Sequence, residues 1–191
     1  MIGWVGMGSG RGAGDGEREG SRTVIPVESG GAGGRFEWSV HRPPALMYRE
    51  IQSMFPARKD GVTKDNLLVV TTCQRTGPDL AGEGQEVDEE KDRCLEVFMA
   101  FGQQVAEELA AAGHWADYVD PCTGHPVREP INLVFPEVEA LEMLLQYKCG
   151  QAGNCKIVMH PQWGSNVYPC SLFTTAPADV LAQAVRKHLP Q

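Results

Sequence analysis

A long amphipathic helix is the feature that most constrains how this chain can fold. Its apolar residues recur at three- and four-residue steps: Leu95, Phe98, Phe101, Val105, Leu109 and Ala112. That spacing predicts one α-helix over residues 88–112 with a single apolar stripe. The acidic run at 88–90 suits the positive end of the helix dipole, and Gly113 suits a helix end. A helix with one apolar face has to pack against another layer of structure.

Strand patterns lie on both sides of this helix. Residues 36–41 alternate apolar and polar side chains, which predicts a half-buried strand, and the apolar run at 67–72 predicts a central strand. Residues 156–159 and 166–174 predict two antiparallel strands connected through 160–165. Further helices are expected at 43–55, 138–147 and 178–189. This order predicts an α+β sandwich with a mainly antiparallel sheet flanked by helices.

The first 34 residues differ in composition from the rest. They are rich in glycine, serine and charge, so we expect a disordered segment at 1–34 followed by one folded domain at 35–191. Residues 6–13 resemble a dinucleotide-binding glycine loop. They lack the preceding strand and following helix that such a loop needs, which favours a linker. No secretory signal or convincing mitochondrial leader is expected there.

Charge and cysteine usage limit the possible partners. The net charge is −8 and the pI about 5.1, which disfavours nucleic acid and anionic membranes. No apolar run is long enough to span a bilayer. The six cysteines form no Cys-x-x-Cys pair, which favours free thiols in an intracellular protein. Packing is expected for Cys73, Cys94 and Cys170.

Motifs of the common catalytic and metal sites are missing. Cys149, Cys155 and His160 are close in sequence, but no second close pair completes four zinc ligands, so no metal site is expected. There is no His-Glu-x-x-His, phosphate loop or Gly-x-Ser-x-Gly. The Asp-x-His-x-x-Gly motif that places histidine under the cobalt of cobalamin is also absent, because Val158 stands where Asp is needed before His160.

Several single residues leave two interpretations open. Cys155 follows a predicted flexible polar loop at 150–154, and Lys156 beside it would favour a thiolate; a buried, inert cysteine is the alternative. Trp115 and Trp163 could stack on a ligand or belong to the core. Paired carboxylates are conceivable at 117 and 120, but Asp before Pro at 120–121 is more simply a turn.

Several colinear segments resemble the methylmalonic aciduria and homocystinuria type D family, the cblD family. Residues 113–121, Gly-His-Trp-Ala-Asp-Tyr-Val-Asp-Pro, resemble the family's Gly-Tyr-Trp-Ala-Asp-Phe-Ile-Asp-Pro. Residues 155–164, beginning Cys-Lys-Ile-Val-Met-His, resemble its Cys-Lys-Val-Ile-Arg-His-x-x-Trp-Gly. Residues 171–176 resemble its Ser-Ile-Phe-Thr-Asn-Ala strand. Shorter matches at 54–56 and 72–76 keep the same order, so the resemblance runs from about 35 to 189.

The resemblance implies a function and a fold. Such a protein has a modified nitroreductase-like α+β fold that has lost its flavin, and it catalyses no known reaction. It docks on the cblC-type cobalamin-processing protein and helps to direct the cofactor to cytosolic methionine synthase and mitochondrial methylmalonyl-CoA mutase. Cobalamin is contacted only in the complex and is not bound stably alone. A family cysteine can supply a thiolate to the cobalt.

The resemblance also fixes the candidate site. Animal members carry two adjacent cysteines where this chain has Asn154-Cys155, so the cobalt ligand is expected to be Cys155, with Cys149 as the weaker alternative. Trp115, Asp117, His160 and Trp163 are expected to shape the partner-docking surface or the fold beneath it. We expect the family's long N-terminal region with its mitochondrial leader to be missing here or replaced by the glycine-rich segment, which puts mitochondrial delivery in doubt. The expected location is the cytoplasm, with the mitochondrion as a second candidate. The first alternative is a flavin-dependent reductase. The second is a thiol-redox or metal protein that uses Cys149 and Cys155.

Overall fold

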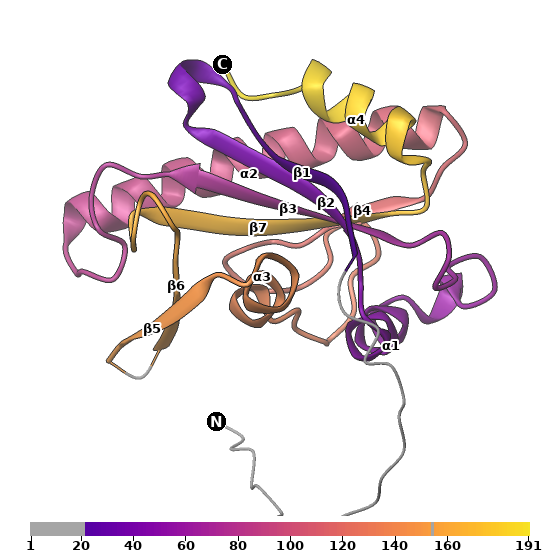
Figure 1. Ribbon diagram of the computed structural model, residues 1–191, viewed down its shortest axis with the longest axis horizontal. Helices are drawn as coiled ribbons and strands as arrows, with labels where there is room; N and C mark the ends of the chain where they lie inside the picture. Colours follow the sequence, from indigo (N-terminus) through magenta and orange to yellow (C-terminus); the bar gives the residue numbers. More distant parts are fainter. Residues whose placement is uncertain (1–21, 154) are drawn as a thin grey trace, which may run out of the picture.

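The computed structural model describes residues 22–153 and 155–191. Its centre is a five-stranded antiparallel sheet in the order β1-β2-β3-β7-β4, and a separate two-stranded sheet pairs β5 with β6 (Figure 1). The strands are β1 (Arg22–Gly30), β2 (Phe36–Arg42), β3 (Leu68–Arg75), β4 (Ala116–Tyr118), β5 (Lys148–Ala152), β6 (Cys155–Met159) and β7 (Val167–Thr174). The helices are α1 (Ala45–Met54), α2 (Gln85–Ala111), α3 (Glu137–Leu145) and α4 (Ala178–Lys187), with short 3-10 turns η1 (Ala32–Gly34) and η2 (Pro56–Arg58).

Helices cover both faces of the large sheet. α2 and α4 lie on one face, and α1 and α3 lie on the other, where the β5–β6 hairpin also stands (Figure 1). Four residues of the predicted α2 stripe are buried in the first of these layers, beside β2: Phe98, Phe101, Val105 and Leu109. Leu95 is half-buried, and Ala112, just after α2, is exposed. Gly113 has a φ of +83° just after α2, a conformation that favours glycine, so the predicted helix end is confirmed. The α+β class and the mainly antiparallel sheet are likewise confirmed.

Strand β2 is buried on both faces, and the expectation of a half-buried strand is wrong. Its polar side chains Glu37, Ser39 and His41 are all buried. They satisfy one another and their neighbours: the Ser39 hydroxyl lies 2.8 Å from Nε2 of His41 and 2.7 Å from the Thr71 hydroxyl. A polar face can therefore be buried under helices when its groups are hydrogen-bonded.

The predicted pairing of the last strands is also wrong. β7 pairs with β3 and β4, whereas β6 pairs with β5. The error came from interpreting residues 150–154 as a loop, because their glycines hide the strand β5. The hairpin closes between Ala152 and Cys155, with Gly153 at a φ of +57°.

The predicted disorder of residues 1–34 is wrong for its second part. β1 occupies Arg22–Gly30 and pairs with β2 along the sheet edge. Val24 and Ile25 of β1 pack on the core, and Glu28 forms an ion pair with Arg186 of α4 at 2.7 Å. The glycine-rich composition concealed these contacts. The glycine loop considered at 6–13, like the rest of 1–21, lies outside the described residues.

The remaining predicted elements agree with the structure within a few residues, including α1, β3, α3 and α4. The buried positions of Cys73, Cys94 and Cys170 match their expected packing roles. In the described part of the chain, no helix has the length and apolar character that a membrane span requires. The nitroreductase-like character of the sandwich stays a prediction.

Candidate functional site

Cys155, the candidate cobalt ligand, is the first residue of β6 in the hairpin that stands apart from the large sheet (Figure 1). The Cys155 side chain is exposed, and that of Cys149 on β5 is half-buried. Alternate residues of a strand point to opposite faces, and Cys149 pairs with Val158. The two thiols therefore lie on opposite faces of the hairpin. This arrangement does not favour a thiol-redox pair made from Cys149 and Cys155.

Lys156 acts on Cys149 and not on Cys155. Its ammonium lies on the hairpin face opposite Cys155, where it pairs with Glu142 of α3 and lies 3.6 Å from Glu139. Burial and the negative charge of Glu142 raise the pKa of the Cys149 thiol, and the charge of Lys156 only partly opposes this. Lys156 was expected to act beside Cys155, but in the structure its ammonium points away from Cys155 and toward α3.

His160 follows β6 directly and is only 4% exposed. Its Nε2 lies 2.9 Å from Oε2 of Glu37 on β2. Its Nδ1 accepts hydrogen bonds from the backbone N–H groups of Gln162 and Trp163, both at 3.2 Å. Because Nδ1 is an acceptor, the imidazole proton sits on Nε2, which donates to the Glu37 carboxylate. Both nitrogens are thus engaged within the protein, and neither is free to bind a metal.

Two aromatic rings enclose the imidazole of His160. The ring of Trp163 stacks on it with centroids 4.0 Å apart, and Tyr147 meets it edge-on at 5.2 Å. Tyr147 directly precedes β5, so the two ends of the hairpin meet at this one ring. Burial, with a smaller contribution from the charge of Glu37, raises the pKa of the Tyr147 phenol.

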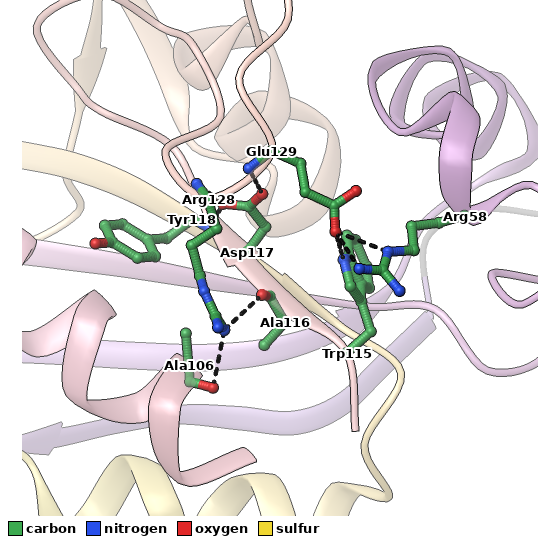
Figure 2. A network of polar contacts seen from close by, with 8 residues as sticks. All are labelled: Arg58, Ala106, Trp115, Ala116, Asp117, Tyr118, Arg128 and Glu129. Atoms are coloured by element: carbon green, nitrogen blue, oxygen red, sulfur yellow. Dashed lines mark hydrogen bonds and ion pairs between the residues drawn. The ribbon is translucent and has the colours of Figure 1, made fainter. Parts of the chain in front are cut away.

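Asp117 lies on β4 and is fully buried (Figure 2). Its Oδ1 accepts from the backbone N–H groups of Tyr118 at 2.7 Å and Arg128 at 2.9 Å, and its Oδ2 accepts from that of Glu129 at 2.9 Å. Burial raises the pKa of the Asp117 carboxyl, although these three hydrogen bonds lower it. The carboxylate therefore holds the 128–129 loop against β4, a structural role beneath the surface.

Trp115 lines an open pocket of about 570 Å³ together with Arg128 and Glu129. Its indole N–H donates to Oε1 of Glu129 at 3.0 Å, and the same oxygen lies 2.7 Å from the Arg58 guanidinium (Figure 2). The ring also packs edge-on against Phe55 at 4.8 Å. Trp115 thus packs partly in the core and partly lines the pocket. Its indole N–H is already bonded to Glu129 and is not free for a ligand.

The structure does not bring the four predicted docking residues together. The carbonyl of Trp115 accepts from the backbone of Thr175, just beyond the C-terminal end of β7. Trp163 lies before the N-terminal end of β7. Eight residues of strand at about 3.3 Å each separate the two ends by roughly 25 Å. Trp115 with Asp117, and His160 with Trp163, are therefore two separate sites.

Sequence reasoning missed two carboxylates with buried oxygens, Glu37 on β2 and Glu137 at the start of α3. Glu37 was taken as the solvent-facing residue of an alternating strand. Glu137 begins α3 and receives the Ser171 hydroxyl on Oε2 at 2.6 Å, while its buried Oε1 has no hydrogen-bond partner among the described residues. Burial raises the pKa of Glu137 to about 7. An acid directly after Pro136 is normal for a helix start, so nothing in the local sequence indicated its burial.

Among the side chains of 22–153 and 155–191, no group of three or more His, Cys, Asp or Glu is arranged to hold a metal ion. Cys155 is an exposed thiol at the first residue of β6.

Comparison with known proteins supplies the family. The model described as methylmalonic aciduria and homocystinuria type D protein matches residues 16–187, most of the chain. This chain belongs to the methylmalonic aciduria and homocystinuria type D family. The family resemblance found in the sequence is thereby confirmed, and its matched region includes both β4 and the hairpin.

Named relatives agree with this family. The cobalamin trafficking protein CblD of Rattus norvegicus is 32% identical over 147 residues, which are 76% of this chain and 48% of the relative. The proteins of the same name from Gallus gallus and Homo sapiens are each 31% identical over 147 residues, with the same shares of the two chains. The chain thus spans about half the length of these curated relatives.

Proposed function

We propose that this chain is a non-enzymatic adaptor in intracellular cobalamin trafficking. The observation that carries the proposal is the exposed Cys155 on a separate hairpin, in a family whose named relatives are cobalamin trafficking proteins. In this proposal cobalamin is cargo held by a partner, as the family resemblance implies.

The partner we propose is the cblC-type cobalamin-processing protein. Docking would present Cys155 to the cobalt of the cobalamin that this partner holds. The adaptor would then direct the cofactor toward methionine synthase and methylmalonyl-CoA mutase, which places it in the cytoplasm and also in mitochondria. These steps follow from the family resemblance.

Cys155 suits the role of cobalt ligand better than Cys149. A thiolate is a soft donor that suits such a metal centre, but it has to reach the metal. Cys155 is exposed on the free face of the hairpin. Cys149 faces α3, beside Glu142, which together with burial raises its thiol pKa.

The docking face that we favour lies at the N-terminal end of β7, next to the β5–β6 hairpin. Trp163 is half-buried next to the hairpin and can contribute surface, while His160 supports it from below. Trp115 and Asp117 lie at the other end of β7, where a partner would have to extend to reach them. Asp117 supports the fold there in either case.

The test is a visible-absorption titration of the protein into the cobalamin-loaded cblC-type partner, with free cobalamin as the control. We expect a spectral shift only with the loaded partner. The shift should vanish in Cys155→Ser and persist in Cys122→Ser, the matched control because Cys122 is also exposed. Loss of the shift in Cys149→Ser alone would instead assign the ligand to Cys149.

Three other outcomes would contradict parts of the proposal. Co-elution with the partner without any shift would keep docking but remove cobalt ligation. Neither shift nor co-elution would contradict the adaptor function. Flavin released from the purified protein on denaturation would favour the flavin-dependent reductase.

A further inference from the structure

We infer that His160 is a positioning residue that fixes the β5–β6 hairpin, and with it Cys155, to the large sheet. The purpose of this positioning rests on the proposed function, but the mechanical role does not. It follows from three sets of contacts that converge on one buried imidazole.

The first contact joins the hairpin to the sheet. Nε2 of His160 donates to Oε2 of Glu37 at 2.9 Å, and Oε1 of the same carboxylate lies 3.4 Å from the Ser29 hydroxyl on β1. Both partners of the first bond are buried, so water does not compete strongly for it. A buried hydrogen bond to a carboxylate is among the stronger side-chain interactions in a protein.

The second set of contacts fixes the chain that leaves β6. Nδ1 accepts from the backbone of Gln162 and Trp163, which shapes the turn directly after the strand. His160 and Gly164 also exchange two backbone hydrogen bonds, at 2.8 and 2.9 Å, with Gly164 at a φ of +59°. The imidazole thus stabilises this turn, and the turn fixes the orientation of the imidazole.

The third contact fixes the chain that enters β5. The edge of Tyr147 packs on the imidazole while Trp163 stacks on it, so both ends of the hairpin are held at one point. Another link, between Lys156 and the acids of α3, is largely exposed. Exposed ion pairs contribute little, so that link is a weak constraint on the hairpin.

Natural cysteines allow a direct measurement of the hairpin position. Nitroxide labels on the exposed Cys122 and Cys155, in a Cys149→Ser background, give an intramolecular distance distribution by pulsed electron paramagnetic resonance. Cys122 is a suitable reference because Asp120 Oδ1 accepts its backbone N–H at 2.8 Å, which orders its turn. The other three cysteines are buried and should stay unlabelled.

The variants separate positioning from general stability. His160→Asn keeps an acceptor near the position of Nδ1 but loses the donor to Glu37. Glu37→Ala removes the acceptor, while Glu37→Gln restores one. His41→Asn is the matched control, since His41 is a buried histidine on the same strand as Glu37 but does not contact the hairpin.

We expect the distance distribution to broaden by roughly twofold in His160→Asn and Glu37→Ala, because the hairpin samples more positions. It should stay narrow in Glu37→Gln and His41→Asn. A narrow distribution in both His160→Asn and Glu37→Ala would overturn the inference. So would equal broadening in His41→Asn, because that would indicate a general loss of packing. If His160→Asn does not fold, the comparison of Glu37→Ala with Glu37→Gln still tests the inference.

A second readout uses unlabelled protein and the cobalamin-loaded partner. The apparent affinity measured from the cobalt–sulfur spectrum should fall about tenfold in Glu37→Ala and recover in Glu37→Gln. If the wild-type protein gives no spectrum, the proposed cobalt ligation by Cys155 fails. The distance distributions need neither cobalamin nor a partner, so they still test the positioning role.

Discussion

Glu37 and His160 are 123 positions apart in the chain, yet their side chains meet at 2.9 Å inside the protein. The contact joins the second strand of the large sheet to the end of a hairpin that belongs to a different sheet. The polar face of β2 is therefore an internal layer that connects two parts of the fold. The properties of that layer and of its neighbours can be measured.

Asp117 should be essential for stability. Asp117→Asn replaces an acceptor oxygen with a donor that faces backbone N–H groups, so we expect a loss of about 3 kcal/mol in the free energy of unfolding. Urea denaturation measures this loss. Asp120→Asn is the control, because Asp120 accepts a single N–H in an exposed turn, and it should lose under about 1 kcal/mol. Equal losses in the two variants would contradict the role assigned to Asp117.

Glu137 should make the protein less stable as the pH rises. Its pKa is raised to about 7 in the folded state, so the folded protein holds a proton that the unfolded chain releases near its ordinary value. Stability is thus present below the unfolded pKa and is lost as the pH rises through 7, by up to about 3 kcal/mol. Glu137→Gln should flatten this profile and be more stable than wild type at high pH.

The measurement for Glu137 is denaturant unfolding at a series of pH values. Glu139→Gln is the matched control, because Glu139 lies on the same helix with its side chain in solvent. It should keep the slope of the wild-type profile. A Glu137→Gln profile as steep as that of wild type would show that another group causes the pH dependence.

The reactivity of Cys149 should depend on the charges that face α3. Glu142→Gln removes the anion that raises the pKa of Cys149, so its alkylation by iodoacetamide near neutral pH should accelerate by about two- to fivefold. Lys156→Ala removes the opposing cation and should slow it. Peptide-resolved mass spectrometry measures both rates. Cys155, on the other face of the hairpin, is the internal control, and changes of the same sign in both variants would contradict this account.

Gly102 should be required where α2 crosses β4. A Cβ atom at this position would lie 2.8 Å from two ring carbons of the buried Tyr118. Gly102→Ala should therefore lose about 1 to 2 kcal/mol of stability, since overpacking outweighs the gain in helix propensity. Gln103→Ala, at the next and exposed position, should instead be neutral or slightly stabilising in thermal unfolding. A stabilised Gly102→Ala protein would show that Tyr118 moves aside without cost.

Local patterns were enough to predict much of the fold. The apolar stripe of α2 and the β-branched run of β3 were identified because each depends on neighbours close in sequence. Pairing was harder: β6 was assigned to β7, and β5 was taken as a loop, because the partner of a strand is set by contacts distant in the chain. The strand β1 was missed for the same reason, since its order depends on β2 and α4.

The candidate site was predicted to a similar extent. Cys155 was singled out from the sequence, and the structure shows it exposed. The sequence could not indicate that Lys156 faces the other way, because that depends on the hairpin register. Nor could it link Glu37 to His160, because that contact depends on where the hairpin packs against the sheet. It also could not indicate that Oε1 of Glu137 is buried, because that depends on how α3 packs against β7. Whether Trp115, Asp117, His160 and Trp163 contribute to docking stays a prediction.

The two sheets of the described chain share no ladder of backbone hydrogen bonds, and this gives them separate energetics. Opening the hairpin would break the contacts around the His160 imidazole and the packing of Val158 in its buried cluster, but it would leave the five-stranded sheet paired. Local opening can therefore require less free energy than global unfolding, so the hairpin behaves as its own cooperative unit. We therefore expect substitutions on the hairpin face that carries Cys155 to leave the stability of the five-stranded sheet unchanged.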